Sequence, residues 1–269
     1  MIEQFINNRL IEGRAFFTRE EALIALGGTS GALSAALNRQ IKKNRLASPR
    51  QGFYVILRPE EQITGADPIR WIDPLMRFID VDYRISLLSA ARLHGASHQA
   101  AMAFQVVTPQ QLRPIILGRH RVEFIYQSPD SFNQVNQTPW VDSLKGDTGY
   151  SKAAGVDLTL FDCVRYIHRA GGLNNVAQIV KDIGGKAAPK QLSKIAEYFD
   201  NACIRRLGYL LDLVGHARQS QALLQFVHRA KNFSPLDPSV KPLESLMAHS
   251  APRSASWLLT INEPIEVDF

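Results

Sequence analysis

Basic side chains and short polar side chains gather in one part of the sequence, between Gly27 and Pro59. This interval holds six arginines and lysines and no aspartate or glutamate. Because no carboxylate screens it, the interval carries a positive field that attracts a polyanion. Long cationic side chains suit phosphates and short polar ones suit the edges of bases, so the chemistry indicated is DNA binding. The residues expected to contact DNA are Thr29, Ser30, Ser34, Asn38, Arg39, Lys42, Lys43, Arg45, Arg50 and Gln51.

Two predicted helices would position these side chains, and the first has a clear start and stop. Thr18 followed by Glu21 forms a capping box, in which the threonine hydroxyl accepts from a backbone N–H and the glutamate returns to the cap. The short apolar helix that follows ends at the glycine pair Gly27-Gly28.

The second helix, over residues 30–43, has the profile of a recognition helix, which enters the major groove of DNA. Thr29 or Ser30 caps its start. Its core face carries apolar residues four positions apart, namely Leu33, Leu37 and Ile41. The opposite face is small and polar at first and basic near the end. We expect Thr29, Ser30, Ser34 and Asn38 to face bases and Arg39, Lys42, Lys43 and Arg45 to hold phosphates.

A β-hairpin is predicted directly after this helix. Residues 45–48 and 53–57 form its strands, and the turn between Pro49 and Gly52 joins them. Arg50 stands at the tip, where a wing would reach an adjacent groove or the DNA backbone. Together these elements predict a winged helix-turn-helix. The alternative is a small helical bundle with a solvated basic face.

The rest of the chain predicts a mixed α/β domain. Prolines and glycines recur over residues 58–75, which read as a linker, so we place a DNA-binding domain at 1–65 and a second domain at 66–269. An apolar helix is expected over 86–93. Short β-rich runs at 104–108, 115–117 and 121–126 indicate a small, mostly antiparallel sheet, and several helices follow between 157 and 230. The predicted fold class is α+β.

Signals for an enzyme are weak. His94 and His98 have the spacing of two metal ligands on a helix, but Gly95 interrupts the helix between them and no third ligand is evident. The sequence contains neither a phosphate-binding loop nor a dinucleotide-binding glycine motif. Asp157 or Asp162 could in principle build an acid/base site, although a helix cap and a buried structural carboxylate explain them more simply. We expect no catalytic residue, no metal and no cofactor.

Seven segments of the sequence follow one known pattern. They are residues 18–23 with the glycine pair, the helix end Lys42-Lys43, residues 52–56, residues 86–96 with Gln99, and residues 104–107, 157–162 and 171–173. Together they resemble the AbiEi-type antitoxins of bacterial type IV toxin-antitoxin (abortive infection) systems, over nearly the whole chain.

The resemblance implies a DNA-binding autorepressor that is also an antitoxin. Its N-terminal winged-helix domain would bind inverted repeats in the promoter of its own operon. Its C-terminal domain would neutralise a nucleotidyltransferase-like toxin, with no stable complex required. In that domain Ser89, Arg92, His94 and Gln99 cluster on one stretch, which we expect to form an antitoxin surface.

Two other functions stay open at this stage. One is a winged-helix regulator without an antitoxin role, whose second domain senses a ligand. The other is a nuclease or phosphotransferase tethered to DNA by the first domain. The first twenty residues carry charges throughout and contain no apolar run, so we expect neither a secretory signal nor a membrane span and predict a cytoplasmic protein.

Overall fold

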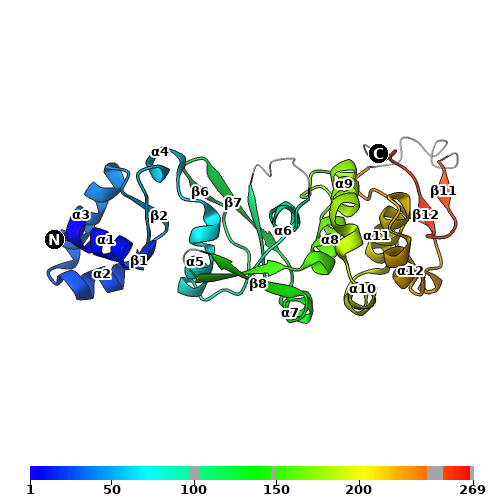
Figure 1. Cartoon of the computed structure of the whole chain (residues 1–269), viewed down its shortest axis with the longest axis horizontal. Coiled ribbons are helices and arrows are strands. Elements are labelled where there is room, and N and C mark those ends of the chain that lie inside the picture. Colours follow the sequence, from blue (N-terminus) through cyan, green and yellow to red (C-terminus); the bar gives the residue numbers. More distant parts are fainter. Residues whose placement is uncertain (97–102, 147–148, 241–250, 267–269) are drawn as a thin grey trace. The chain divides into compact units, whose positions relative to one another are not determined.

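The computed structural model describes residues 1–96, 103–146, 149–240 and 251–266 (Figure 1). The chain forms two compact units. The first unit comprises Met1–Arg84, Met102–Ser128 and Ser143–Lys152, and the second unit comprises Ile85–Ala101, Pro129–Asp142 and Ala153–Phe269. The structure is a mixture of helices and small sheets, which confirms the α+β class.

The N-terminal part of the first unit consists of three helices and a small sheet. The elements in chain order are α1 (Ile2–Ile11), β1 (Phe16–Thr18), α2 (Arg19–Leu26), α3 (Ser30–Lys42), β2 (Leu46–Arg50) and β3 (Phe53–Ile56). The strands pair antiparallel in the order β1-β3-β2. Helices and sheet bury a shared core that includes Ile6, Phe17, Leu33, Leu37, Leu46 and Ile56. Phe17 joins the two layers, because its ring lies edge-on to Phe5 of α1 and stacks on Tyr54 of β3.

The local signals in the sequence set the bounds of α2 and α3. Glu21 N–H donates to Thr18 Oγ1 (3.2 Å) and Thr18 N–H donates to Glu21 Oε2 (2.7 Å), so the predicted capping box is confirmed. Helix α2 ends where Gly27 adopts a φ of 64°, a conformation that glycine reaches without strain. Thr29 is the residue that caps α3, since its hydroxyl accepts from the N–H of Ala32.

After β3, the end of α4 and the β6–β7 hairpin are held together by a close approach of two backbones. Helix α4 (Glu61–Thr64) precedes Gly65, and the turn of the hairpin formed by β6 (Ile115–Leu117) and β7 (His120–Tyr126) contains Gly118. A Cβ on Gly118 would lie 2.3 Å from the carbonyl oxygen of Thr64, and one on Gly65 would lie 2.2 Å from that of Leu117. Arg119 N–H donates to the same Thr64 oxygen (2.8 Å). Helices η1 (Pro68–Arg70) and α5 (Ile72–Phe78) complete this part.

The predicted sheet exists, and it contains parallel pairs that the sequence did not predict. It has six strands in the order β6-β7-β5-β4-β9-β8. The others are β4 (Arg84–Ile85), β5 (Phe104–Thr108), β8 (Val141–Gly146) and β9 (Gly149–Ala154). Strand β5 runs parallel to β7, and β4 runs parallel to β9. Alternating apolar residues predict where strands lie, but they do not predict which strands pair with each other. Here β6 pairs antiparallel with β7, on the side of β7 away from β5.

Helices dominate the second unit. They are α6 (Leu87–Leu93), α7 (Pro129–Val135), α8 (Val156–Arg165), α9 (Leu173–Ile183), η2 (Gly184–Lys186), α10 (Pro189–Ala196), α11 (Asn201–Leu213), α12 (Ala217–Leu224) and η3 (Val227–Arg229). Asp157 does not cap α8 as predicted, because Gly155 occupies the cap position and Asp157 lies within the first turn. None of the helices among the described residues is both long enough and apolar enough to cross a membrane.

A small three-stranded sheet ends the described chain. Its strands are β10 (Ser234–Pro235), β11 (Arg253–Ser254) and β12 (Leu259–Thr260), in the order β10-β12-β11. The side chain of Trp257 anchors it: the indole is 1% exposed, and its Nε1 donates to Asp212 on α11 (2.6 Å). Gly208 makes room for the ring, since a Cβ there would lie 2.1 Å from it.

Candidate functional site

The exposed face of α3 carries the side chains that the sequence selected for DNA. Leu33, Leu37 and Gln40 are buried, whereas Asn38, Arg39 and Lys42 are exposed. In the part of the chain that the structure describes, neither Arg39 nor Lys42 forms an ion pair. Their charges therefore remain available to an anion from outside the protein.

Arg19, at the first position of α2, is a neighbour of this face that the sequence patterns did not select. Its Nη2 donates to the carbonyl oxygen of Ser30 (2.9 Å), to Ser30 Oγ (2.9 Å) and to Ser34 Oγ (2.8 Å). The Ser34 hydroxyl in turn donates to the Ser30 carbonyl (3.0 Å). Ser34 can therefore only accept a further hydrogen bond, whereas the Ser30 hydroxyl keeps its proton for a base or phosphate. The available sequence signal was an arginine directly after a helix cap.

Lys43 and Arg45 lie on the flank of α3 that faces α1. Lys43 pairs with Glu3 at 3.2 Å, and Arg45 donates to Asn7 at 2.9 Å and lies 3.6 Å from Glu3. Hydrogen bonds from Gln40 and Lys43 hold the pKa of Glu3 below its usual value. These pairs are exposed and hence weak, so a phosphate can displace Glu3 at little cost. The structure thus separates these two cations from Arg39 and Lys42.

Arg50 does not project from the tip of the hairpin as the sequence predicted. Its Nη2 donates to the carbonyl oxygen of Arg113 (2.6 Å), and its guanidinium lies 6.0 Å from the ring centre of Phe124. Burial lowers the pKa of Arg50, and the nearby charge of Arg113 lowers it further. Local sequence could not show this, because Arg113 and Phe124 come from a distant segment of the same unit. Gln51 is exposed at the turn.

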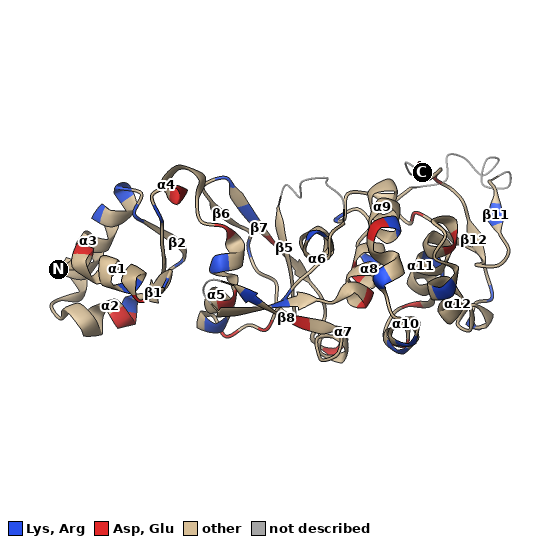
Figure 2. Ribbon diagram, in the orientation of Figure 1, with Lys and Arg blue, Asp and Glu red and all other residues tan. Residues whose placement is uncertain are grey.

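The two units differ in net charge. The first unit holds 17 lysines and arginines against 12 aspartates and glutamates, and the second holds 14 against 13. Figure 2 shows basic residues of the first unit on α3, on β2 and on the β6–β7 hairpin, and on other elements such as α5. The net positive charge of the chain therefore belongs almost entirely to the unit that contains α3.

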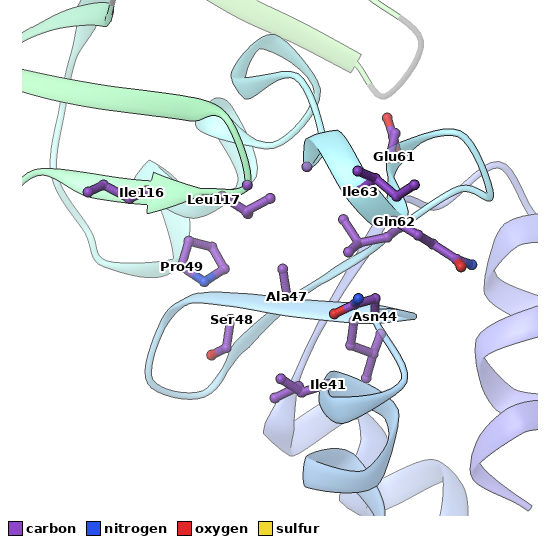
Figure 3. A pocket seen from close by; sticks show the side chains of 14 residues that line it. Ile41, Asn44, Ala47, Ser48, Pro49, Glu61, Gln62, Ile63, Ile116 and Leu117 are labelled. Carbon is purple, nitrogen blue, oxygen red and sulfur yellow. The ribbon is translucent and has the colours of Figure 1, made fainter.

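A cavity of about 520 Å³ lies beside the end of α3 (Figure 3). Ile41 and Asn44 line it from the α3 end, Ala47 from β2, Gln62 from α4 and Leu117 from β6. Its charged lining residue, Glu61, is ion-paired with Arg70. The volume lies within the range of small-molecule sites, and the lining exposes polar and apolar surface in similar amounts.

The expected antitoxin surface is only partly a surface. Ser89 is 6% exposed on the inner side of α6, so it cannot contribute to one. Arg92 is exposed. His94 is half-buried, with Nε2 donating to the carbonyl oxygen of Ala154 (2.7 Å), while Lys186 donates to the His94 carbonyl (2.6 Å). Gln99 and His98 lie outside the described residues.

The carboxylates considered for catalysis have structural partners. Asp162 is fully buried and accepts from the hydroxyl of Ser86 (2.6 Å). Asp157 accepts from the N–H of Ala188 (3.0 Å). Burial raises the pKa of Asp157, and the charge of Asp142 adds to the effect. No group of three or more His, Cys, Asp or Glu among the described residues could hold a metal ion.

Comparison with known proteins decides the class of the region after β4. Residues 84–213 match the family model of the AbiEi antitoxin C-terminal domain. The chain carries an AbiEi-type antitoxin domain. This confirms the resemblance seen in the sequence, and it supports an antitoxin role in a toxin-antitoxin system. The family that matches is one of antitoxins, not of enzymes.

The AbiEi domain occupies residues that belong to both units. Arg84, residues 102–128 and residues 143–152 of this domain lie in the first unit. Its other residues lie in the second unit. The RV2827C protein from Mycobacterium tuberculosis has a similar fold: a crystal structure of it aligns with a TM-score of 0.69 at 14% identity, over 96% of this chain and 89% of that chain. No curated protein matches the chain.

Proposed function

We propose that the protein is a sequence-specific DNA-binding autorepressor and the antitoxin of a type IV toxin-antitoxin system. The observation that carries this proposal is an AbiEi antitoxin domain in the same chain as α3, whose exposed basic face lacks any ion pair at Arg39 or Lys42 among the described residues. An antitoxin needs no affinity for DNA, so these unpaired cations are best explained by a second activity.

A winged helix-turn-helix over residues 1–65 is the DNA-binding domain in this proposal. The order of elements supports it: two helices joined by the short Gly27–Thr29 turn, then the antiparallel β2–β3 hairpin, with β1 as third strand. Helix α3 enters the major groove, Ser30, Ser34 and Asn38 approach the bases, and Arg39 and Lys42 bind phosphates. Inverted repeats in its own promoter are the proposed operator.

The antitoxin domain, over residues 66–269 in this proposal, counters a nucleotidyltransferase-like toxin in the cytoplasm without requiring a stable complex. The match over residues 84–213 supports this part. Among the described residues of the expected surface Arg92 is the exposed one, so it is the first position to test. Co-expression with the adjacent toxin gene gives the readout: growth should be rescued by the intact chain and lost with Arg92→Glu.

The DNA-binding half is tested by gel shift on the region upstream of the gene. We expect Arg39→Ala with Lys42→Ala to abolish the specific complex at moderate salt and to lower the slope of log affinity against log salt by about two units, one for each phosphate contact. The matched control is Lys190→Ala with Lys194→Ala, which removes two exposed lysines four residues apart on α10. Equal affinity in both double variants would remove α3 from the interface.

A ligand-sensing regulator is the second candidate, and the cavity beside Ile41 and Asn44 is the observation that favours it. A ligand there would contact the end of α3 and could shift DNA affinity. The identity of the adjacent gene discriminates, since the main proposal requires a nucleotidyltransferase-like toxin beside this gene. In the same gel shift, Ala47→Leu should mimic a bound ligand if the cavity is regulatory, because it fills the space.

A further inference from the structure

Arg19 is the first residue of α2, and its side chain reaches the start of α3. Both its backbone and its guanidinium are held by hydrogen bonds. Its backbone N–H donates to the carbonyl oxygen of Gly52 in the hairpin turn (2.7 Å). Its Nη2 donates to Ser30 and Ser34, with three contacts of 2.8–2.9 Å. The hairpin, α2 and α3 therefore meet at one arginine, whose guanidinium has lost most of its freedom before any ligand arrives.

The charge of Arg19 has no partner in the described part of the chain. Glu21, on the same helix, accepts from the Thr18 N–H and lies within ion-pair distance of Arg9 and Arg14. All three side-chain bonds of Arg19 use Nη2. The donors on Nε and Nη1 therefore have no acceptor among the described residues.

Stability of α3 does not explain a cation at this position. The start of a helix carries partial positive charge, so an arginine beside it is repelled rather than attracted. A neutral glutamine could donate to the two serines without that repulsion. The position is thus better suited to an arginine when an anion completes the arrangement, because Nη1 keeps charged N–H donors for a phosphate oxygen.

We propose that Arg19 binds a backbone phosphate of DNA through Nη1 while its Nη2 holds Ser30 and Ser34 toward the bases. This inference rests on the proposed DNA-binding function and extends the interface from α3 to the start of α2. The inference also limits the base contacts of Ser34. Its hydroxyl already donates to the Ser30 carbonyl, so it can only accept a hydrogen bond from a base.

The test is fluorescence anisotropy of the full chain with two labelled duplexes, over a series of salt concentrations. One duplex covers the region upstream of the gene, and the other is a scrambled duplex of equal length and composition. We expect Arg19→Ala and Arg19→Gln to bind both duplexes about tenfold more weakly, with the salt slope lower by about one unit. Arg14→Ala is the matched control, because Arg14 is exposed and already faces Glu12 and Glu21 at 3.8 and 3.9 Å. It should leave affinity and slope unchanged.

The outcomes separate the inference from the proposed function. An unchanged salt slope in Arg19→Gln, which keeps an amide donor for the serines, overturns the phosphate contact even if Arg19→Ala is less stable. A loss confined to the upstream duplex overturns it too, since only a base contact depends on sequence. If the unaltered chain binds neither duplex, the DNA-binding function itself fails. A uniform loss in both Arg19 variants, with Arg14→Ala unaffected, supports the inference.

Discussion

The first and second units of the chain use their polar side chains in opposite ways. In the first unit, Arg39 and Lys42 are exposed and form no ion pair with the described residues. Arg19 is held by Ser30 and Ser34 through Nη2, and its other N–H groups have no acceptor among the described residues. In the second unit, buried polar side chains have partners within the unit: Asp162 accepts a hydrogen bond from Ser86, and Arg205 donates to the Leu258 carbonyl (2.6 Å). Exposed cations on one face can bind an anion from outside the protein, whereas buried polar groups with partners hold the unit together.

The comparison also shows that a sequence family and a compact unit need not share boundaries. The segment 102–128 belongs to the AbiEi antitoxin domain, yet it lies in the first unit with α3. Contacts at Gly118 and Arg50 fasten it there. The part of the chain proposed to bind DNA and part of the antitoxin domain therefore share one compact unit, so a change in this segment can affect both activities.

The largest expected effect is in the second unit, at Trp257. Trp257→Ala removes a fully buried indole and its bond to Asp212, which should lower the free energy of unfolding by about 3–5 kcal/mol. Urea denaturation measures it, with Trp257→Phe as the milder control. If the units are as distinct as their charges suggest, DNA affinity below the unfolding transition stays unchanged. A parallel loss of affinity would break the comparison.

A smaller effect is expected in the first unit, at Gly118. Its φ is 61°, and a Cβ would meet the Thr64 carbonyl, so Gly118→Ala should destabilise the chain by about 2–4 kcal/mol. Gly13→Ala is the matched control, with a φ of 73° but open space around the new methyl group, and should cost about 1 kcal/mol. Equal losses in the two variants would show that the β6–β7 hairpin is not fastened to α4 in solution. Thermal unfolding distinguishes these results.

The smallest expected effect concerns pH and belongs to the second unit. Because burial raises the pKa of Asp157, the folded chain binds a proton there more tightly than the unfolded chain does. Its contribution to stability is therefore fully present below the unfolded pKa of about 3.8 and is lost as pH rises through the higher folded value. Asp157→Asn, whose side-chain oxygen can still accept from Ala188, should remove this dependence. Urea midpoints of both proteins across mildly acidic pH check the sign.

Local signals in the sequence were enough for the N-terminal elements. The Thr18–Glu21 capping box, the stop at Gly27 and the hairpin around Gly52 depend on residues within a few positions of each other, and the structure has all three. The strands β5, β6 and β7 were located as well, because each is a short apolar run between turns. Their order and direction were not, since pairing is a contact between distant segments.

For the candidate site, too, the sequence showed the local features and the structure showed the contacts between distant segments. The sequence by itself determined which stretch is basic, which face of α3 is apolar, and which antitoxin family the chain resembles, because composition and periodicity are local properties. Only the tertiary structure decided that Arg50 turns to Arg113, that Ser89 is buried, and that Arg19 holds Ser30 and Ser34. The physical reason is that hydrogen bonds and burial depend on which distant segments come into contact. One local sequence pattern is compatible with many different tertiary contacts.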